Sequence, residues 1–191
     1  TGELIFRPSG HGALLENIND IDADIIFIKN IDNVVIEELT ENSSFYKKML
    51  AGKLLWIQNK VFGYLRTLAE NNVDPEFIKE VKSFLWNELN IKDISDDVEN
   101  IEDILNRPIR ICGVVKNMGA AGGGPFWVQD VMGKVTLQIV ELAQIDLKDE
   151  HQKTITNKAT HFNPVDLVCG IRDYRGKKFD LSRFTNPNSG F

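Results

Sequence analysis

Cysteines and long apolar runs are scarce in this sequence, and each shortage excludes a class of protein. Its 191 residues include two cysteines, Cys112 and Cys169, far apart and each inside an apolar stretch. Such cysteines predict buried, reduced thiols and are too few for a disulfide framework or a metal site. No stretch approaches the roughly 20 apolar residues that a membrane-spanning helix needs. We therefore expect a cytoplasmic protein with no membrane partner.

Basic residues are also in deficit. Lysine and arginine number 22 against 28 acidic residues, which gives a net charge of −6 and a sequence pI near 5.1. Because affinity for nucleic acid depends on clustered lysine and arginine, a nucleic-acid polymer is not expected as a partner. A small phosphorylated ligand is still compatible with this charge. A Gly-x-Ser-x-Gly motif is absent, so nothing supports a catalytic triad.

The rest of the composition is that of an ordinary folded protein, with 42% hydrophobic and 26% charged residues. The chain is long enough for one or two domains with a sizeable core. We expect an α/β fold with a mixed, mostly parallel sheet. Its core would comprise residues 1–36 and 107–191, with residues 37–106 forming a helical insertion.

The most informative stretch is the loop Arg7–Gly12 and the apolar run that follows it. Gly10 and Gly12 can adopt positive φ and allow a ligand to approach the backbone closely. A short helix is expected next, and its free N–H groups would point back toward the turn. The run from Ala23 to Ile31 predicts a strand buried on both faces, parallel to an earlier strand whose last residues are Leu4–Phe6. Such strands carry their chemistry at the carboxyl end.

Residues 37–107 have helical periodicity. Apolar residues at steps of three and four predict one long helix with a single buried stripe, from Phe45 and Met49 to Leu65 and Leu68. Asp74 and Pro75 predict the start of a second helix, and Asp96 is the expected N-cap of a third. Beyond Pro108, apolar runs predict further strands, with a hairpin turn at Met132-Gly133 and a last strand over residues 165–171.

The loop Pro8–Gly12, with the pattern Pro-x-Gly-His-Gly, and the strand end Ile31–Asn33 resemble the UDP-sugar type of sugar-nucleotide pyrophosphorylase. A wider match, over Phe6–Val34, Val114–Phe126 and Phe162–Phe184, resembles DUF4301, an uncharacterised bacterial family related to those enzymes. The resemblance implies a nucleotide-diphospho-sugar transferase fold. Those enzymes also have an earlier Gly-rich loop that binds the triphosphate. We expect the half of the fold that carries this loop to be missing before Thr1.

The resemblance also implies roles for individual residues. Gly10, His11 and Gly12 would lie against the nucleotide base, and Asp32 would hold a divalent metal such as Mg²⁺ near the phosphates. Lys116 would neutralise a phosphate as the catalytic cation. Its neighbours differ from the Glu-Lys-Pro context of related enzymes, and a solvated lysine beside a flexible loop is the competing interpretation.

Further candidates follow from position. Asp166 is a candidate second metal ligand, although turn formation explains it equally well. Asn30 and Asn33 are candidates for binding the sugar or its phosphate. So are Gly123 and Gly124, in a loop that either closes over a sugar or simply turns the chain.

Three functions remain open. The first is transfer of a nucleotidyl group between a nucleoside triphosphate and a sugar 1-phosphate, with Mg²⁺ as cofactor. The second is a non-catalytic module that binds a nucleotide sugar. The third is a protein-interaction domain in which the helices of residues 37–107 form the partner surface. An exposed apolar stripe on those helices would favour this last function.

Overall fold

The computed structural model describes most of the chain. The described residues are 12, 14–31, 34, 36–37, 40–70, 73–92, 94–119, 122–130 and 133–185. Their regular elements, in chain order, are α1 (Leu14–Asp20), β1 (Ile25–Lys29), α2 (Thr40–Ala69), α3 (Pro75–Leu89), α4 (Val98–Leu105), β2 (Ile109–Cys112), β3 (Val115–Lys116), β4 (Gly124–Gln129), β5 (Val135–Val140), α5 (Glu150–Asn157), β6 (His161–Phe162) and β7 (Asp166–Gly170). Two 3₁₀ turns, η4 (Leu142–Gln144) and η5 (Leu181–Phe184), complete them.

The strands form antiparallel sheets, so the expectation of a mostly parallel sheet of the transferase type is wrong. The main sheet has the order β1-β7-β2, and β7 is antiparallel to both neighbours. The other sheets are the pairs β3-β6 and β4-β5, also antiparallel. β1 and β2 do run in the same direction. They are not neighbours, because the late strand β7 lies between them, and that insertion makes every pairing antiparallel.

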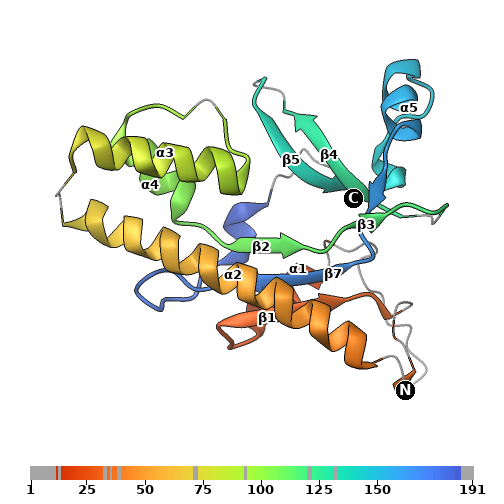
Figure 1. Cartoon of the computed structure of the whole chain (residues 1–191), viewed down its shortest axis with the longest axis horizontal. Coiled ribbons are helices and arrows are strands. Elements are labelled where there is room, and N and C mark those ends of the chain that lie inside the picture. The colour runs from red at the N-terminus through yellow and green to blue at the C-terminus, as the bar shows by residue number, and fades with distance from the viewer. Residues whose placement is uncertain are drawn as a thin grey trace, which may run out of the picture.

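The main sheet is covered on both faces. α2 crosses one face, where it contacts β7 and β2 (Figure 1). There the amide of Gln58 fills the space beside Gly170, where any side chain would collide with it. The opposite face carries a smaller apolar cluster of Ile26, Ile171 and Leu181, against which α1 also packs. The central strand is therefore the most enclosed, and Val168 is fully buried.

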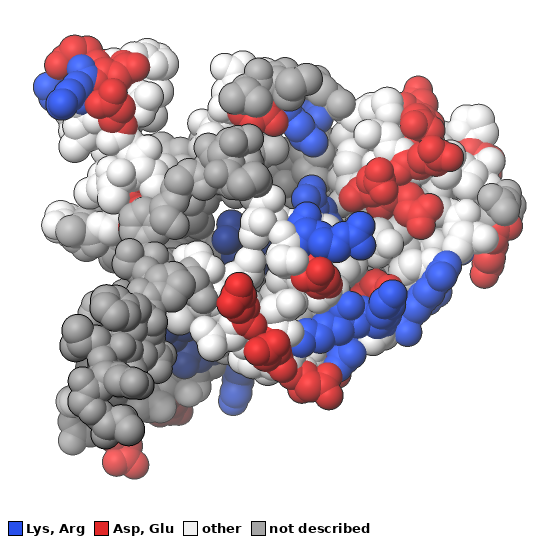
Figure 2. All heavy atoms as spheres, turned by 180° about the vertical axis from the view of Figure 1, so that it is seen from behind, with Lys and Arg blue, Asp and Glu red and all other residues white. Residues whose placement is uncertain are grey.

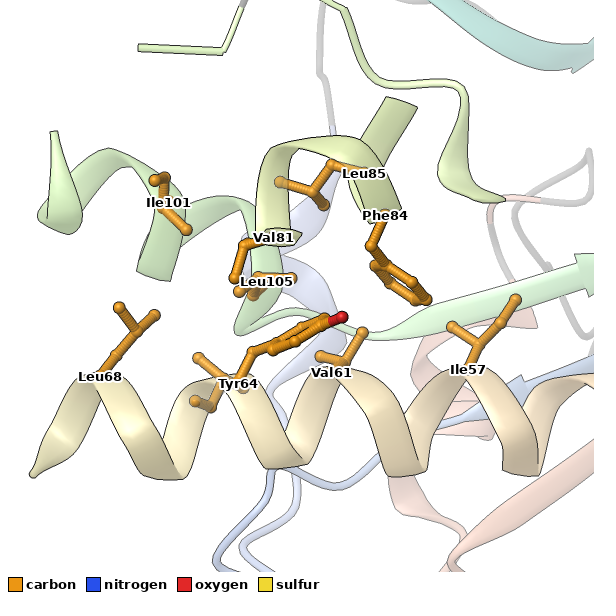
Figure 3. Close-up of a cluster of buried hydrophobic side chains, with 10 residues drawn as sticks. Ile57, Val61, Tyr64, Leu68, Val81, Phe84, Leu85, Ile101 and Leu105 are labelled. Atoms are coloured by element: carbon orange, nitrogen blue, oxygen red, sulfur yellow. The ribbon is translucent and has the colours of Figure 1, made fainter. Parts of the chain in front are cut away.

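The larger core lies between the three consecutive helices α2, α3 and α4 (Figure 3). Its buried members are Ile57, Val61, Tyr64, Leu65, Leu68, Val81, Phe84, Leu85, Ile101 and Leu105. Burying a large aliphatic or aromatic side chain contributes about 1.5–3 kcal/mol, so these residues dominate the stability of the helical part.

The sequence located these helices closely. Asp74 caps α3 by accepting a hydrogen bond from the Phe77 backbone, and Pro75 begins the helix, as predicted. The predicted cap of α4 was wrong by one residue, because Asp97 rather than Asp96 accepts the capping bond. The predicted buried stripe of α2 was also too long. Phe45 and Met49 are 58% and 55% exposed.

A bulge joins the main sheet to the pair β3-β6. Cys112 pairs with Leu167 and Val115 pairs with Phe162, so two residues on one strand face the four residues 163–166 on the other. Segments 109–116 and 161–170 thus form one antiparallel ribbon with an irregular centre. Bulges of this kind bend a ribbon and are common next to functional sites.

Asn163 holds the bulge in place and is only 4% exposed. Its side-chain amide donates to the Gly113 carbonyl at 2.5 Å, and its side-chain oxygen accepts from the Val165 N–H at 3.1 Å. Its own N–H donates to the Gly123 carbonyl at 2.8 Å, directly before β4. One buried residue therefore links the segments that lead into all three sheets.

We expect Asn163→Ala to lower the free energy of unfolding by about 2–3 kcal/mol, because it leaves two partly buried backbone groups, the Gly113 carbonyl and the Val165 N–H, without their partner. Urea denaturation followed by circular dichroism measures the change. The control is Asn157→Ala at the exposed end of α5, which should change it by less than about 0.5 kcal/mol. Equal losses in the two variants would show that the hydrogen bonds of Asn163 carry no special weight.

Candidate functional site

The end of β1 and the start of β7 place opposite charges side by side. Lys29 and Asp166 are paired in register, and the Lys29 ammonium lies 3.0 and 3.1 Å from the two carboxylate oxygens of Asp166. Their side chains are 20% and 25% exposed, so the pair is partly screened from water yet reachable. A cation and an anion are thus held together at a bulged strand end.

Val165, next to Asp166, has a strained backbone. Its φ of +58° lies in the left-handed region, which a β-branched residue adopts rarely and at a cost of about 1–2 kcal/mol. The carbonyl of Val165 accepts a hydrogen bond from the Asn30 N–H at 3.2 Å, and its N–H is bound by Asn163. Strain that neighbouring hydrogen bonds maintain is typical of functional sites.

The structure thus brings two of the predicted site residues together. Asn30 directly follows β1, and its backbone touches the residue before Asp166. Gly12 is exposed near the start of α1. The remaining members of the predicted nucleotide and metal sites, Gly10, His11, Asp32 and Asn33, lie outside the described residues.

Lys116 and the glycine loop occupy the neighbouring small sheets. Lys116 is exposed in β3 and pairs with His161 in β6. Gly123 and Gly124 are buried, and a side chain at either would collide: with the Glu141 carboxylate at Gly123, and with the His161 carbonyl at Gly124. Close packing therefore accounts for both glycines. The hydrogen bond from Asn163 to Gly123 connects this loop to the bulge.

No metal centre is complete within the part of the chain that the structure describes. There, no group of three or more histidine, cysteine or acidic side chains converges on one point. Both oxygens of Asp166 already contact the Lys29 ammonium. A divalent cation at Asp166 would therefore have to share the carboxylate with that ammonium or displace it.

The two cysteines are free and lie on adjacent strands, as reduced, partly buried thiols. Burial raises the pKa of Cys169 to about 11, and the nearby Cys112 adds to this while the Arg110 charge opposes it. Burial likewise raises the pKa of Cys112. Since the thiolate is the reactive form, neither cysteine is suited to act as a nucleophile.

Two residues of the site were missed by reasoning from the sequence. They are Lys29, in the apolar run that ends at Ile31, and Asn163, three residues before Asp166. The Asn163-Pro164 step was the available signal, because an Asn-Pro pair favours a break in regular structure. What the sequence could not show is that this break faces the end of β1.

On the face seen in Figure 2, acidic and basic side chains are interspersed. No helix among the described residues is long and apolar enough to cross a membrane.

The fold and the site define an α and β protein built from small antiparallel sheets, with a charged, bulged site at one end of the main sheet. Comparison with known families adds one assignment. The model of DUF4301, a domain of unknown function, matches residues 1–191, and the chain belongs to this family. No curated protein and no solved structure matches the chain.

We expect Val165→Gly to change the free energy of unfolding by less than about 1 kcal/mol. Relief of the left-handed strain opposes the lost side-chain contacts and the greater freedom of the unfolded chain. The comparison is Val168→Gly, which removes a fully buried side chain from the central strand and should cost about 3 kcal/mol or more. Chemical denaturation of both variants measures this. Similar losses would show that Val165 carries no strain.

The thiols give a second prediction. At pH 8 we expect the folded protein to react with a disulfide reagent such as DTNB at least about 100-fold more slowly than the urea-unfolded chain, because burial holds the thiols protonated. Since the folded chain keeps the Cys169 proton to higher pH than the unfolded chain, the associated stability is complete below pH 9 and is lost as the pH rises toward about 11. Rapid labelling of the folded protein would contradict the assignment.

Proposed function

We propose that this chain is part of a protein that binds a nucleoside triphosphate or nucleotide sugar and transfers a nucleotidyl group to or from a sugar 1-phosphate. The supporting observation is that Asn30 and Asp166, two residues singled out for phosphate and metal binding, lie together beside Lys29 at the bulge. The resemblance of the Pro-x-Gly-His-Gly loop to the sugar-nucleotide pyrophosphorylases supplies the reaction class. It is a likeness of motifs and carries no support from the fold.

This reaction suits a site made of charges and backbone groups. In-line attack by a sugar phosphate on the α-phosphorus needs positioning and neutralisation of developing charge, with little covalent help from the protein. Lys29 and Lys116 are the cations we propose for the phosphates, and Asn30 is the proposed contact to the sugar. Gly10, His11 and Gly12 would bind the base.

Metal binding at the site depends on the ion pair. In the proposal, Asp166 and Asp32 would hold Mg²⁺, which would neutralise charge on the phosphates, and Lys29 would contact a ligand phosphate. Mg²⁺ commonly takes one or two carboxylates and completes its shell with water and phosphate oxygens.

A non-catalytic nucleotide-sugar binding module is the alternative. It uses the same residues and differs only in the absence of turnover. Release of pyrophosphate from a nucleoside triphosphate and a sugar 1-phosphate by the full-length protein would exclude it.

Titration calorimetry with nucleoside triphosphates and nucleotide sugars tests the proposal. We expect Lys29→Met to weaken binding in Mg²⁺ at least about tenfold, which corresponds to about 1.4 kcal/mol. The matched control is Lys148→Met, a substitution of an exposed lysine outside the site, which should leave binding unchanged.

Asp166→Asn should act in opposite directions with and without metal. In Mg²⁺ it should weaken binding, because a metal ligand is lost. In EDTA it should strengthen binding, because the carboxylate no longer repels phosphate or occupies Lys29. Failure of every nucleotide to bind the complete protein would remove the proposal, and unchanged binding by both variants would move the site elsewhere.

A further inference from the structure

The long helix α2 carries a second row of residues on its solvent side. We name this row the outer seam; its members are Phe45, Met49, Gly52, Trp56, Asn59 and Gly63. The three large side chains are strongly exposed, with exposed fractions of 58% for Phe45, 55% for Met49 and 43% for Trp56. The two glycines and Asn59 are exposed as well. Apolar side chains thus line a surface that the described part of the chain leaves uncovered.

The outer seam is distinct from the buried row of the same helix. The buried row includes Leu54, Ile57, Val61 and Leu68, which pack on the sheet and on α3 and α4. At 100° per residue, the two rows lie roughly 150° apart around the helix axis. A helix with an apolar row on each of two sides is built to pack on two sides.

The spacing of the outer seam indicates what packs there. Its members follow one another at steps of four, three, four, three and four residues. That heptad spacing is the pattern by which one helix packs along another, with each large side chain inserted between residues of the facing helix. A strand or a flat surface has no need of this repeat.

The two glycines of the outer seam also indicate that a partner helix packs there. Gly52 and Gly63 lie inside a 30-residue helix, where glycine is less favourable than alanine. A Cβ atom added at either position would meet no atom of another part of the chain within 4 Å. Nothing in the described structure therefore requires glycine here, whereas a closely approaching partner helix would.

The charges beside the outer seam indicate what kind of helix binds there. The positions beside the seam carry Lys48, Lys53 and Lys60, all exposed. Lys53 is bound to Glu88 at 2.7 Å and lies over the Trp56 ring. Within the described ranges, neither Lys48 nor Lys60 forms an ion pair. Two copies of α2 would place lysines against lysines, so a second copy of this chain is disfavoured and an acidic partner is favoured.

A groove runs beside the seam. It has a volume of about 510 Å³ and lies between α2 and α3. Trp56, Tyr64 and Phe84 supply its aromatic part. Lys60 is its charged residue from α2, and its charged residues from α3 are Glu76, Lys79, Glu80 and Glu88. Trp56 therefore contributes both to the outer seam and to the groove.

We propose that the outer seam of α2 binds an amphipathic helix of a separate protein, whose apolar heptad row is flanked by acidic residues. This interaction surface is independent of the nucleotide site proposed above. The apolar row of the partner would pack between Phe45 and Trp56, and its glutamate or aspartate side chains would pair with Lys48 and Lys60.

Two synthetic helical peptides of about 28 residues test the proposal. Both carry leucine at the two apolar positions of each heptad, which are meant to face the outer seam. One has glutamate and the other lysine at the flanking positions, so that like charges keep each peptide monomeric. We expect the glutamate peptide to bind the 191-residue chain at least about tenfold more tightly than the lysine peptide, and its binding to weaken as salt is raised. Fluorescence anisotropy of a labelled peptide measures both.

Variants of the chain locate the binding surface. Lys60→Glu and Met49→Glu should each weaken binding of the glutamate peptide at least about tenfold. Lys148→Glu makes the same charge change away from the helices and should leave binding unchanged. Gly52→Gln should raise the melting temperature of the free chain, because glutamine is the better helix former, while weakening peptide binding. Opposite signs of these two effects separate a binding role from a folding role.

Several results would overturn the proposal. They are equal affinity for the two peptides, no binding of either, or binding that the seam variants leave intact. A concentration-dependent dimer in sedimentation that Met49→Glu dissociates would assign the seam to a second copy of the chain instead.

Discussion

The hydrogen bonds of Asn163 are the constraint on which the arrangement of the sheets depends. A buried amide must find partners for its oxygen and its nitrogen, and Asn163 finds them on both strands of a bent ribbon. Those bonds fix where the ribbon departs from regular pairing, and this in turn sets the position of Asp166 opposite Lys29. The left-handed backbone of Val165 is held by the same bonds. The polar site and the bend are therefore one feature of the molecule, and neither can move alone.

Local features of the fold were readable from the sequence because local forces produce them. The cap and proline of α3 act within one helical turn, and the periodicity of α2 reports its buried side directly. The error lay in extending that stripe to Phe45 and Met49. Periodicity shows that a residue shares a face, and it cannot show whether any element covers that face.

The sheet topology was not readable for a different reason. The order strand, helices, strand from β1 to β2 is typical of a parallel crossover, and both strands do run the same way. Which strand lies between them depends on contacts with residues 166–170, more than 130 positions after β1. The same distance hid the pairing of Lys29 with Asp166. Asn30 and Asp166 could be singled out separately as polar residues at strand ends, while their closeness needed the register of β1 against β7.

The late position of β7 also shapes how the protein must be made. During synthesis from the amino terminus, β1 and β2 emerge long before the strand that joins them, so both have unpaired edges while more than fifty further residues are added after β2. Pairings between distant segments form slowly, and open strand edges promote aggregation. The helices α2, α3 and α4 emerge together and share a core made of near neighbours, which allows them to assemble first. The order of the chain therefore favours assembly of the three helices before β7 completes the main sheet. Production at low temperature or with chaperones should suit this protein.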